Sequence, residues 1–300
     1  MAAIPQVVLV VNPFASRVRE ETLARVEEEV ARVCRLTVVR TRRPRHATEL
    51  VRDACRDGAD AILVYSGDGG FNEALNGLEH DVPIGFLPGG GTSVLSRALG
   101  LPLDPVEAAR RLVDALGQNR TRRITLGRVN GRRFAFGAGL GLDAEAVRRV
   151  DEMGRKGDGQ RPGDLAFALA VLRALAAHRG HLDPALEVKG LGRAAFVFVA
   201  NGSPYTYAKR LPLPIAPEAQ FELGLDVVAP VRVRRRSLLH TAVNILTGRA
   251  RGRGVLYAHD LDRVEVVCDR PTPLQADGED LGDVEEAVFD AERGAVSVLA

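Results

Sequence analysis

Residues 65–78 read YSGDGGFNEALNGL, and this stretch decides the fold because it joins a strand pattern to a helix pattern. The apolar run AILVY (61–65) leads into it and is typical of a buried strand. An aspartate among glycines follows, and then the helix-forming stretch FNEALNGL (71–78). Glycines let a ligand approach the backbone, and the helix behind them directs free N–H groups at the same space.

Strand and helix patterns alternate through the first 120 residues. Short apolar runs predict strands at 7–11, 36–40, 61–65 and 83–88, and periodic segments predict helices at 18–33, 46–57, 71–78, 92–100 and 105–117. Pro105 in the last helix follows Asp104, a candidate cap. Such alternation predicts a parallel sheet, whose ligands bind outside the carboxyl ends of the strands.

The pattern changes after about residue 121. Short alternating runs separated by Gly, Pro and Asn predict an antiparallel β domain, with strands in RITLGRV, RFAFGAG, AAFVFVA, LDVVAPVRV, RVEVVC and AVSVLA. One helix is predicted at 163–178, after a polar, glycine-rich stretch (151–162) that is predicted to be a loop. We therefore expect an α/β domain over residues 1–122 and a β-rich domain over residues 123–300.

Two strand-to-helix turns are rich in glycine, SGDGG (66–70) and PGGGTS (88–93). Phosphate is the natural ligand of such turns, although each alone is equally explained as an ordinary tight turn. Their position at successive strand ends favours phosphate binding. Asp68 is a candidate ligand for Mg²⁺, directly or through water, or a residue that orders the loop. Neither turn contains the G-x-x-x-x-G-K-[ST] phosphate loop.

Composition excludes several classes of function. The chain has 300 residues, with 41 basic and 39 acidic side chains, which is not the basic bias of a nucleic-acid-binding protein. Three scattered cysteines, with no C-x-x-C, argue against a disulfide framework or a zinc site and favour a reducing cytoplasm. The longest apolar stretch, LAFALAV (165–171), is shorter than the roughly 20 residues of a membrane span.

Six motifs in order resemble the diacylglycerol kinase catalytic-domain family of lipid kinases, which includes sphingosine kinases and bacterial diacylglycerol kinases. They are VNPFAS (11–16), TRRPRHATEL (41–50), SGDGGFNEALNGL (66–78), PGGGTSVLSRALGLP (88–102), FGAGLGLDAEAV (136–147) and PLQADGED (273–280). Each motif alone is moderately specific, whereas the ordered set covers most of the chain.

The resemblance implies a nucleotide-binding α/β domain like those of NAD kinases and phosphofructokinases, followed by a β-sandwich that helps to form a lipid site. It implies ATP with Mg²⁺ as phosphoryl donor, and Asp277 and Glu279 as an acidic pair that handles the proton of the lipid hydroxyl. It implies a nucleotide site, with Asp68 also the candidate metal ligand, made by Asn12, Thr41, Ser66, Gly67, Asp68, Gly69, Gly70, Asn72, Glu73, Gly90, Gly91 and Thr92.

The D-G-E stretch (277–279) also has a direct chemical interpretation. On an extended segment its two carboxylates would face one side, where one could hold a metal and the other accept a proton. The alternative is a hairpin turn, because Asp-Gly is a strong turn signal.

The chain departs from the family pattern at several positions. Gly70 and Gly91 stand where the family has Thr, Ser66 stands where it usually has Gly, and Ser93 stands where it has Asn. Thr125 replaces an acidic residue, and Leu223 replaces the Asp of an Asp-Gly pair that usually forms a structural Mg²⁺ site.

Basic runs at 232–236 and 248–254 flank an apolar stretch, SLLHTAVNILTG (237–248). This pattern fits a membrane-surface element, or a core-packed helix with a solvated basic end. We predict an ATP-dependent lipid kinase, cytoplasmic and peripheral at the inner membrane surface, with a homodimer left open. The alternatives are a kinase of a soluble substrate such as NAD and a non-catalytic nucleotide-binding protein.

Overall fold

A computed structural model describes most of the chain: residues 4–156, 173–174, 177–208, 211–234, 243–244, 247–249, 252 and 254–300. The chain divides into two compact units. The first comprises Met1–Thr125 and Gly294–Ala300, and the second comprises Leu126–Arg293. The predicted domain boundary between residues 122 and 123 remains a prediction.

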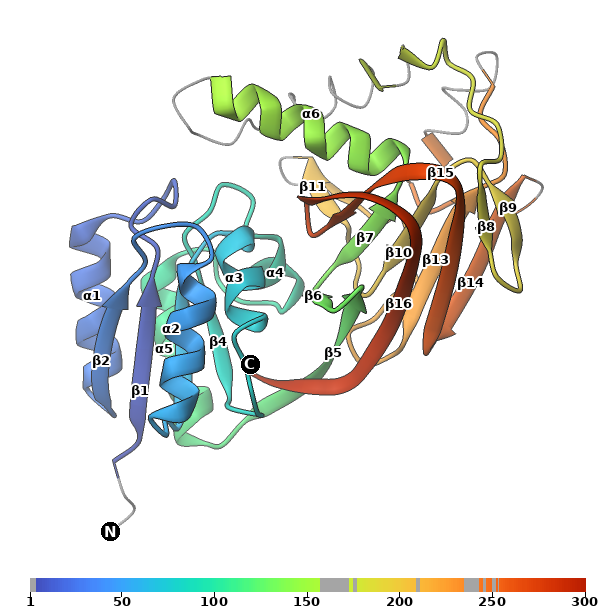
Figure 1. The fold of residues 1–300 in the computed structure, drawn as a ribbon. Coiled ribbons are helices and arrows are strands. Elements are labelled where there is room, and N and C mark those ends of the chain that lie inside the picture. Colours follow the sequence, from blue (N-terminus) through green and yellow to red (C-terminus); the bar gives the residue numbers. More distant parts are fainter. Residues whose placement is uncertain are drawn as a thin grey trace. The chain divides into compact units, whose positions relative to one another are not determined.

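The first unit is built on a parallel sheet of four strands in the order β2-β1-β3-β4 (Figure 1). The strands are β1 (Gln6–Val11), β2 (Arg35–Arg40), β3 (Ala61–Ser66) and β4 (Ile84–Pro88). Every residue of β3 and β4 is buried, as expected for the centre of a parallel sheet that is covered on both faces. The predicted alternation of strands and helices is confirmed.

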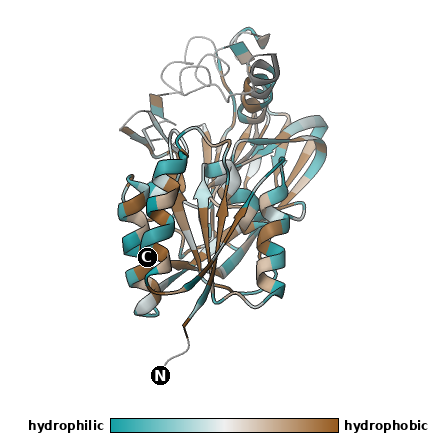
Figure 2. Cartoon of the chain, turned by 90° about the vertical axis from the view of Figure 1, so that its left-hand side faces the viewer, coloured by the Kyte–Doolittle hydropathy of each residue, from teal (hydrophilic) through white to brown (hydrophobic). Residues whose placement is uncertain are grey.

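Five helices belong to this unit: α1 (Glu20–Ala31), α2 (His46–Arg56), α3 (Asp68–Leu75), α4 (Val94–Ala98) and α5 (Pro105–Gly117). Figure 2 shows apolar strands between helices whose outer faces are hydrophilic. The predicted cap of α5 is confirmed, because Asp104 Oδ1 accepts hydrogen bonds from Val106 N (3.0 Å) and Glu107 N (2.9 Å). Helix α3 begins at Asp68 rather than at Phe71, so the glycines form its first turn.

The last residues of the chain return to the first unit. Val298, in the long strand β16 (Glu279–Leu299), pairs in parallel with Ile84 of β4. Asp81 fixes this return, because its carboxylate accepts hydrogen bonds from Ser297 N (2.9 Å) and Ser297 Oγ (3.0 Å) and pairs with Arg123 (2.7 Å). The sheet edge beside β4 therefore depends on residues from the opposite end of the sequence.

The second unit is an antiparallel β structure with the strand order β14-β13-β10-β7-β15-β16. A β8–β9 hairpin lies on β15, β5 pairs with β16 and β6, and β11–β12 form a separate hairpin. Its apolar core includes Phe134, Val199, Val227 and Phe289. The bounds are β5 (Thr121–Val129), β6 (Arg132–Phe134), β7 (Gly137–Leu140), β8 (Leu186–Val188), β9 (Gly192–Ala194), β10 (Val197–Ala200), β11 (Thr206–Ala208), β12 (Leu211–Leu213), β13 (Leu225–Pro230), β14 (Val255–Leu261) and β15 (Arg263–Ala276).

Two predictions for this half need correction or lie outside the described residues. The loop predicted at 151–162 is wrong over residues 151–156, which belong to α6 (Leu142–Lys156), and residues 157–162 lie outside the described residues. The polar and charged residues there occupy helical positions, so polarity alone was a poor guide to a loop. Residues 173, 174 and 177 are helical, but the rest of the predicted 163–178 helix and most of the basic–apolar segment 232–254 lie outside the described residues.

Two properties relevant to location follow from the part of the chain that the structure describes. None of its helices combines the length and the apolar character needed to cross a bilayer. Cys34, Cys55 and Cys268 are buried free thiols.

Candidate functional site

The order of strands in the first unit places two loops side by side. Strands β1 and β3 are neighbours, although β2 lies between them in sequence, so the chain reverses direction across the sheet at this point. Asn12 follows β1, and its N–H donates to Tyr65 O at the end of β3 (3.0 Å). Thr41, which follows β2, donates through Oγ1 to Asn12 Oδ1 (3.4 Å). The structure thus brings Asn12 and Thr41 together at the switch point, where α/β sheets bind their ligands.

Asp68 connects the two glycine loops. Its Oδ2 accepts a hydrogen bond from Val94 N and its Oδ1 accepts one from Leu95 N, both at 3.0 Å. Gly89 N also donates to Ser66 O (2.7 Å). The carboxylate therefore caps α4, which is the loop-ordering role that the sequence left open for Asp68.

The loop glycines fall into two kinds. A Cβ added to Gly90 would lie 2.8 Å from Gly67 Cα, so the two backbones touch where a side chain has no room. By contrast, a Cβ at Gly69 or Gly91 would meet no atom within 4 Å, and both residues are exposed. The fold therefore requires glycine at residues 67 and 90 but leaves open space above residues 69 and 91. Half-buried Thr92 lies next to this second glycine.

Gly70 is explained by its neighbour Ser66. A Cβ at Gly70 would lie 2.1 Å from Ser66 Oγ, so the serine hydroxyl occupies the space of a side chain at residue 70. Ser66 is 1% exposed, and its Oγ has no hydrogen-bond partner among the described residues. A Thr at residue 70 and a Ser at residue 66 would therefore compete for the same space. The Ser66 side chain itself is shielded from the loop surface.

Glu73 and Asn72 have partners other than the glycine loops. The Glu73 carboxylate accepts hydrogen bonds from Arg45 N (2.9 Å) and Ala47 N (3.2 Å), which places it at the N-terminus of α2. Asn72 is 4% exposed, and its Oδ1 accepts from Asn76 Nδ2 (3.2 Å) within one helix turn. Asp68 therefore supplies a side-chain connection between the two glycine loops, whereas the Glu73 carboxylate bonds the start of α2.

The D-G-E stretch forms a two-residue hairpin turn between β15 and β16. Asp277 and Gly278 both have positive φ (46° and 76°), and Ala276 pairs with Glu279 across the turn. The turn alternative is therefore correct, and the extended arrangement with both carboxylates on one side is wrong. Positive φ at both central residues matches the twist of the flanking strands, which favours Asp-Gly here.

The two acidic residues of this turn have different surroundings. Asp277 Oδ2 accepts from Ala135 N (2.6 Å), and its Oδ1 accepts from Phe136 N (2.9 Å) and Gly137 N (3.1 Å). These bonds make Asp277 an anchor for the backbone between β6 and β7. Glu279 instead forms an ion pair with Arg132, and 39% of its side chain is exposed. Both residues are half-buried, and they differ in that main-chain donors hold both Asp277 oxygens while Glu279 faces a side chain.

Asp143, at the start of α6, is a buried carboxyl that the sequence reasoning did not single out. It accepts hydrogen bonds from Tyr205 Oη (3.0 Å) and Gln275 Nε2 (2.5 Å). Burial raises the pKa of Asp143 to about 6, against the lowering effect of these two donors. Gln275 Oε1 in turn accepts from Gly278 N (2.8 Å), so Asp143 supports the D-G-E turn indirectly. The available signal was its place in the FGAGLGLDAEAV motif.

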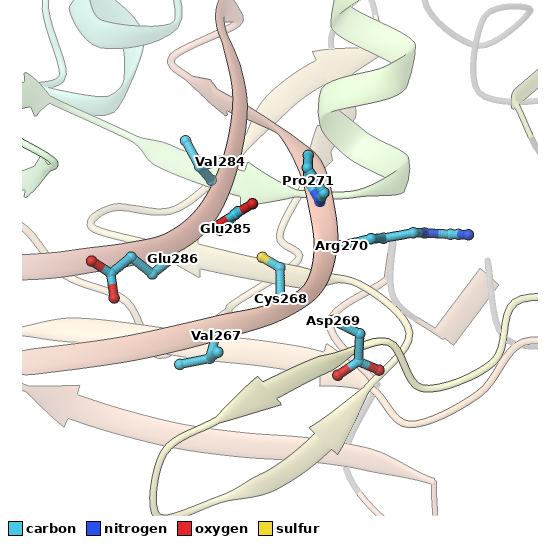
Figure 3. Close-up of a pocket in the computed structure, with 8 residues that line it drawn as sticks. All are labelled: Val267, Cys268, Asp269, Arg270, Pro271, Val284, Glu285 and Glu286. Carbon is cyan, nitrogen blue, oxygen red and sulfur yellow. The ribbon is translucent and has the colours of Figure 1, made fainter.

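Described residues of the second unit line at least two surface depressions. The larger, of about 830 Å³, opens where β15 bulges out of register with β16 between Val267 and Thr272 (Figure 3). The other, of about 580 Å³, includes Glu145, which contacts His178 Nε2 at 3.0 Å. Neither is lined by Asp277 or Glu279, so neither lies at the D-G-E turn. The larger is lined by Val267, Cys268, Asp269, Arg270, Pro271, Val284, Glu285 and Glu286.

Asp68, the acidic residue of the two glycine loops, is not part of a preformed metal site among the described residues. Within the described ranges, no group of three or more His, Cys, Asp or Glu side chains is arranged to hold a metal ion. Asp68 is the acidic residue of the two loops, and main-chain N–H groups bond both of its oxygens. The donor set therefore does not fit a resident Mg²⁺ ion at these loops.

Together, the fold and the loops define a class: an α/β protein with glycine-rich loops at a switch point, followed by a β-sandwich. Residues 6–129 match the family described as "Diacylglycerol kinase catalytic domain", and residues 138–300 match the "YegS C-terminal NAD kinase beta sandwich-like domain". The chain belongs to the diacylglycerol kinase-type lipid kinase family that combines these two domains. The predicted fold class and family are thereby confirmed.

Relatives and solved structures agree with this assignment. A provisionally named lipid kinase of Streptococcus pneumoniae serotype 4 is 24% identical over 259 residues, covering 85% of this chain and 81% of the relative. A crystal structure of a diacylglycerol kinase from Bacillus anthracis aligns with a TM-score of 0.75 at 20% identity, covering 98% of this chain and 96% of the other. An NAD kinase from Archaeoglobus fulgidus in complex with ATP aligns with a TM-score of 0.54 at 14% identity, covering 98% and 93%. Both structural likenesses concern the fold.

Proposed function

We propose that the chain is an ATP-dependent lipid kinase that transfers the γ-phosphoryl group to a hydroxyl of diacylglycerol or a related lipid. The observation that carries the proposal is the pair of glycine loops joined by Asp68, with open space above Gly69 and Gly91. Membership of the diacylglycerol kinase family supports the reaction class. The use of a lipid as the phosphoryl acceptor is a further proposal, beyond the reaction class.

The donor site follows from the backbone of these loops. Helix α3 begins at Asp68, so its first N–H groups and the positive end of its dipole lie at the loop, where they suit phosphate oxygens. Asn12 and Thr41 supply polar side chains at the neighbouring strand ends. Mg²⁺ would arrive with ATP and neutralise phosphate charge. In this scheme Asp68 acts by holding the loops together rather than by touching the nucleotide.

The acceptor side rests on the D-G-E turn. We assign Glu279 as the candidate general base, because main-chain donors hold both oxygens of Asp277, whereas 39% of the Glu279 side chain is exposed and Arg132 orients it. Asp277 then serves as a positioning residue through its three main-chain hydrogen bonds. A cytoplasmic location with peripheral contact at the inner membrane surface, through the segment 232–254, remains part of the proposal, as does a homodimer.

Matched glycine variants test the nucleotide site. A Cβ added at residue 69 or 91 would meet no protein atom within 4 Å, so both alanine variants should fold as well as the wild type. Ala at residue 69 also favours the first turn of α3. Each should nevertheless weaken ATP binding about tenfold or more by filling ligand space, measured by isothermal titration calorimetry. Gly90→Ala is the control for a folding defect, because its Cβ would lie 2.8 Å from Gly67 Cα. Unchanged ATP affinity in both Gly69→Ala and Gly91→Ala would contradict this site.

A substrate panel tests the reaction. The chain is incubated with γ-labelled ATP, Mg²⁺ and vesicles containing diacylglycerol, monoacylglycerol, ceramide or sphingosine, with NAD as a soluble acceptor. Label in a lipid that disappears in Glu279→Gln supports the proposal. Label in NAD alone would identify a kinase of a soluble substrate. ATP binding with no transfer to any acceptor would identify a non-catalytic nucleotide-binding protein.

A further inference from the structure

A buried carboxylate in the second unit lies at the position where the family pattern suggests a structural metal. Asp226 lies in β13, two residues after the Leu223-Gly224 pair, and its side chain is fully buried (0% exposed). A buried carboxylate without counter-charge or hydrogen-bond donors is strongly destabilising, so its partners must be accounted for. In relatives of this family the Asp-Gly pair usually supplies a Mg²⁺ site; here the acidic member of that pair is an apolar leucine.

Protein donors surround the Asp226 carboxylate. Its Oδ1 lies 2.8 Å from His259 Nδ1 and accepts from Asp260 N (3.2 Å). Its Oδ2 and Glu218 Oε2 each lie 3.0 Å from Tyr257 Oη, whose single proton serves one of the two carboxylates at a time. This convergence arises from a bulge between β13 and β14, where Leu225 pairs with Leu261 but Val227 pairs with Ala258. The extra residue in β14 turns its main chain and His259 toward Asp226.

Arg293 provides fixed positive charge in the same cluster. Its guanidinium lies 2.8 Å from Asp260 Oδ1, and its Nε donates to Asp262 Oδ1 (2.5 Å). Asp260 Oδ1 also accepts from Gly224 N (2.7 Å), which ties the arginine to the glycine of the former Asp-Gly pair. The Gly224 hydrogen bond, followed by Arg293, lowers the pKa of Asp260.

The Arg293 guanidinium also approaches Gly224 directly. A Cβ at Gly224 would lie 2.7 Å from Arg293 Nη2 and 2.5 Å from Leu261 O. A divalent cation here would be repelled by the guanidinium and would compete with main-chain and side-chain donors for the same oxygens. Mg²⁺ requires near-octahedral oxygen ligands at about 2.0–2.1 Å, and the carboxylates of this cluster already face protein donors.

We propose that Arg293, with the donors around Asp226, takes over the role that the family pattern gives to a structural Mg²⁺ ion, so the second unit is stable without a metal. The counter-charge is carried by the chain itself. This inference is separate from the proposed kinase activity, because it concerns the β-sandwich in the absence of nucleotide and lipid.

Thermal unfolding of the full chain, without nucleotide, tests the proposal. The wild-type Tm should be the same in excess EDTA and in millimolar MgCl₂, and Arg293→Ala should lower Tm by roughly 4 °C in both buffers. Arg263→Ala is the matched control, because Arg263 also makes two ion pairs, with Glu265 and Asp290, on an exposed part of the sheet. It should lower Tm by no more than about 1–2 °C.

A reverse variant keeps the test decisive if Arg293→Ala folds poorly. Leu223→Asp combined with Arg293→Ala restores an Asp-Gly pair and removes the guanidinium, so Mg²⁺ should raise the Tm of this double variant but not that of the wild type. Elemental analysis of wild-type protein purified without chelator should find well below one Mg²⁺ per chain. A wild-type Tm that falls in EDTA and recovers with Mg²⁺ would overturn the proposal, as would equal effects of Arg293→Ala and Arg263→Ala.

Discussion

Two aspartates, one in each unit, bond main-chain N–H groups of a distant segment, yet their surroundings differ. Asp68 accepts two such bonds, and next to it lie glycines that face open space. Asp277 accepts three, and beside it lies Glu279, whose side chain is 39% exposed. Under the proposed function, the first arrangement presents backbone to a ligand, and the second presents a side chain. The comparison teaches that the acidic residue that stands out in a motif can hold two segments together while its neighbours face outward.

The largest expected effect is the loss of the Asp277 anchor. Asp277→Ala should lower the free energy of unfolding by about 4 kcal/mol, because three N–H groups lose a charged acceptor. Asp68→Ala, which removes two such bonds, should cost about 2–3 kcal/mol. Urea denaturation followed by circular dichroism measures both. Asp277→Gly is the control, since it permits positive φ without a carboxylate; wild-type stability in that variant would refute the anchor.

The exchange between Ser66 and Gly70 predicts a strong non-additive effect. Gly70→Thr should destabilise the protein by about 3 kcal/mol, because its Cβ would lie 2.1 Å from Ser66 Oγ. Ser66→Gly in the same chain should recover most of that loss and restore the family pattern in this loop. The four proteins of the double-mutant cycle are compared by denaturant unfolding and by ATP affinity. Additive effects of the two substitutions would show that the residues do not share this space.

The buried carboxyl of Asp143 predicts a pH dependence. Its pKa is raised from 3.8 to about 6, so the folded state binds a proton more tightly than the unfolded state does. The stabilisation is fully present below pH 3.8 and is lost as the pH rises through about 6, amounting to about 2–3 kcal/mol. Because pH 5 already lies inside this transition, about 1 kcal/mol of the stabilisation is lost between pH 5 and pH 7, and Asp143→Asn should remove that part of the pH dependence. An unchanged pH dependence would contradict it.

The smallest effect concerns backbone conformation at Arg45. This exposed residue has φ 65° immediately before α2, a conformation that costs a non-glycine residue about 1 kcal/mol. Arg45→Gly should therefore be more stable than Arg45→Ala by about 1 kcal/mol, since both variants remove the same guanidinium. The comparison isolates the backbone contribution. Equal melting temperatures for the two variants would mean that the segment relaxes to another conformation.

Much of the first unit could be predicted from local patterns, whereas less of the second could. Apolar runs and the Asp104–Pro105 start signal located the strands and α5, because burial and capping act over a few residues. The β8–β9 and β11–β12 hairpins were missed, since three-residue strands carry too short an alternation to be recognised. The hydrogen-bond partners of Glu73 could not be predicted, because the N-terminus of α2, in another segment, supplies them.

The sequence by itself determined the alternation of strands and helices, the two glycine loops at strand ends and the ordered motifs of a lipid kinase family. Only the tertiary structure decided which group each carboxylate meets. Asp68 finds its donor 26 residues away, Asp277 finds one 142 residues away, and Arg293 meets Asp260 across the bulged edge of the β-sandwich. A carboxylate has the same chemistry wherever it stands, and its role depends on the N–H group or guanidinium that the long-range path of the chain brings to it.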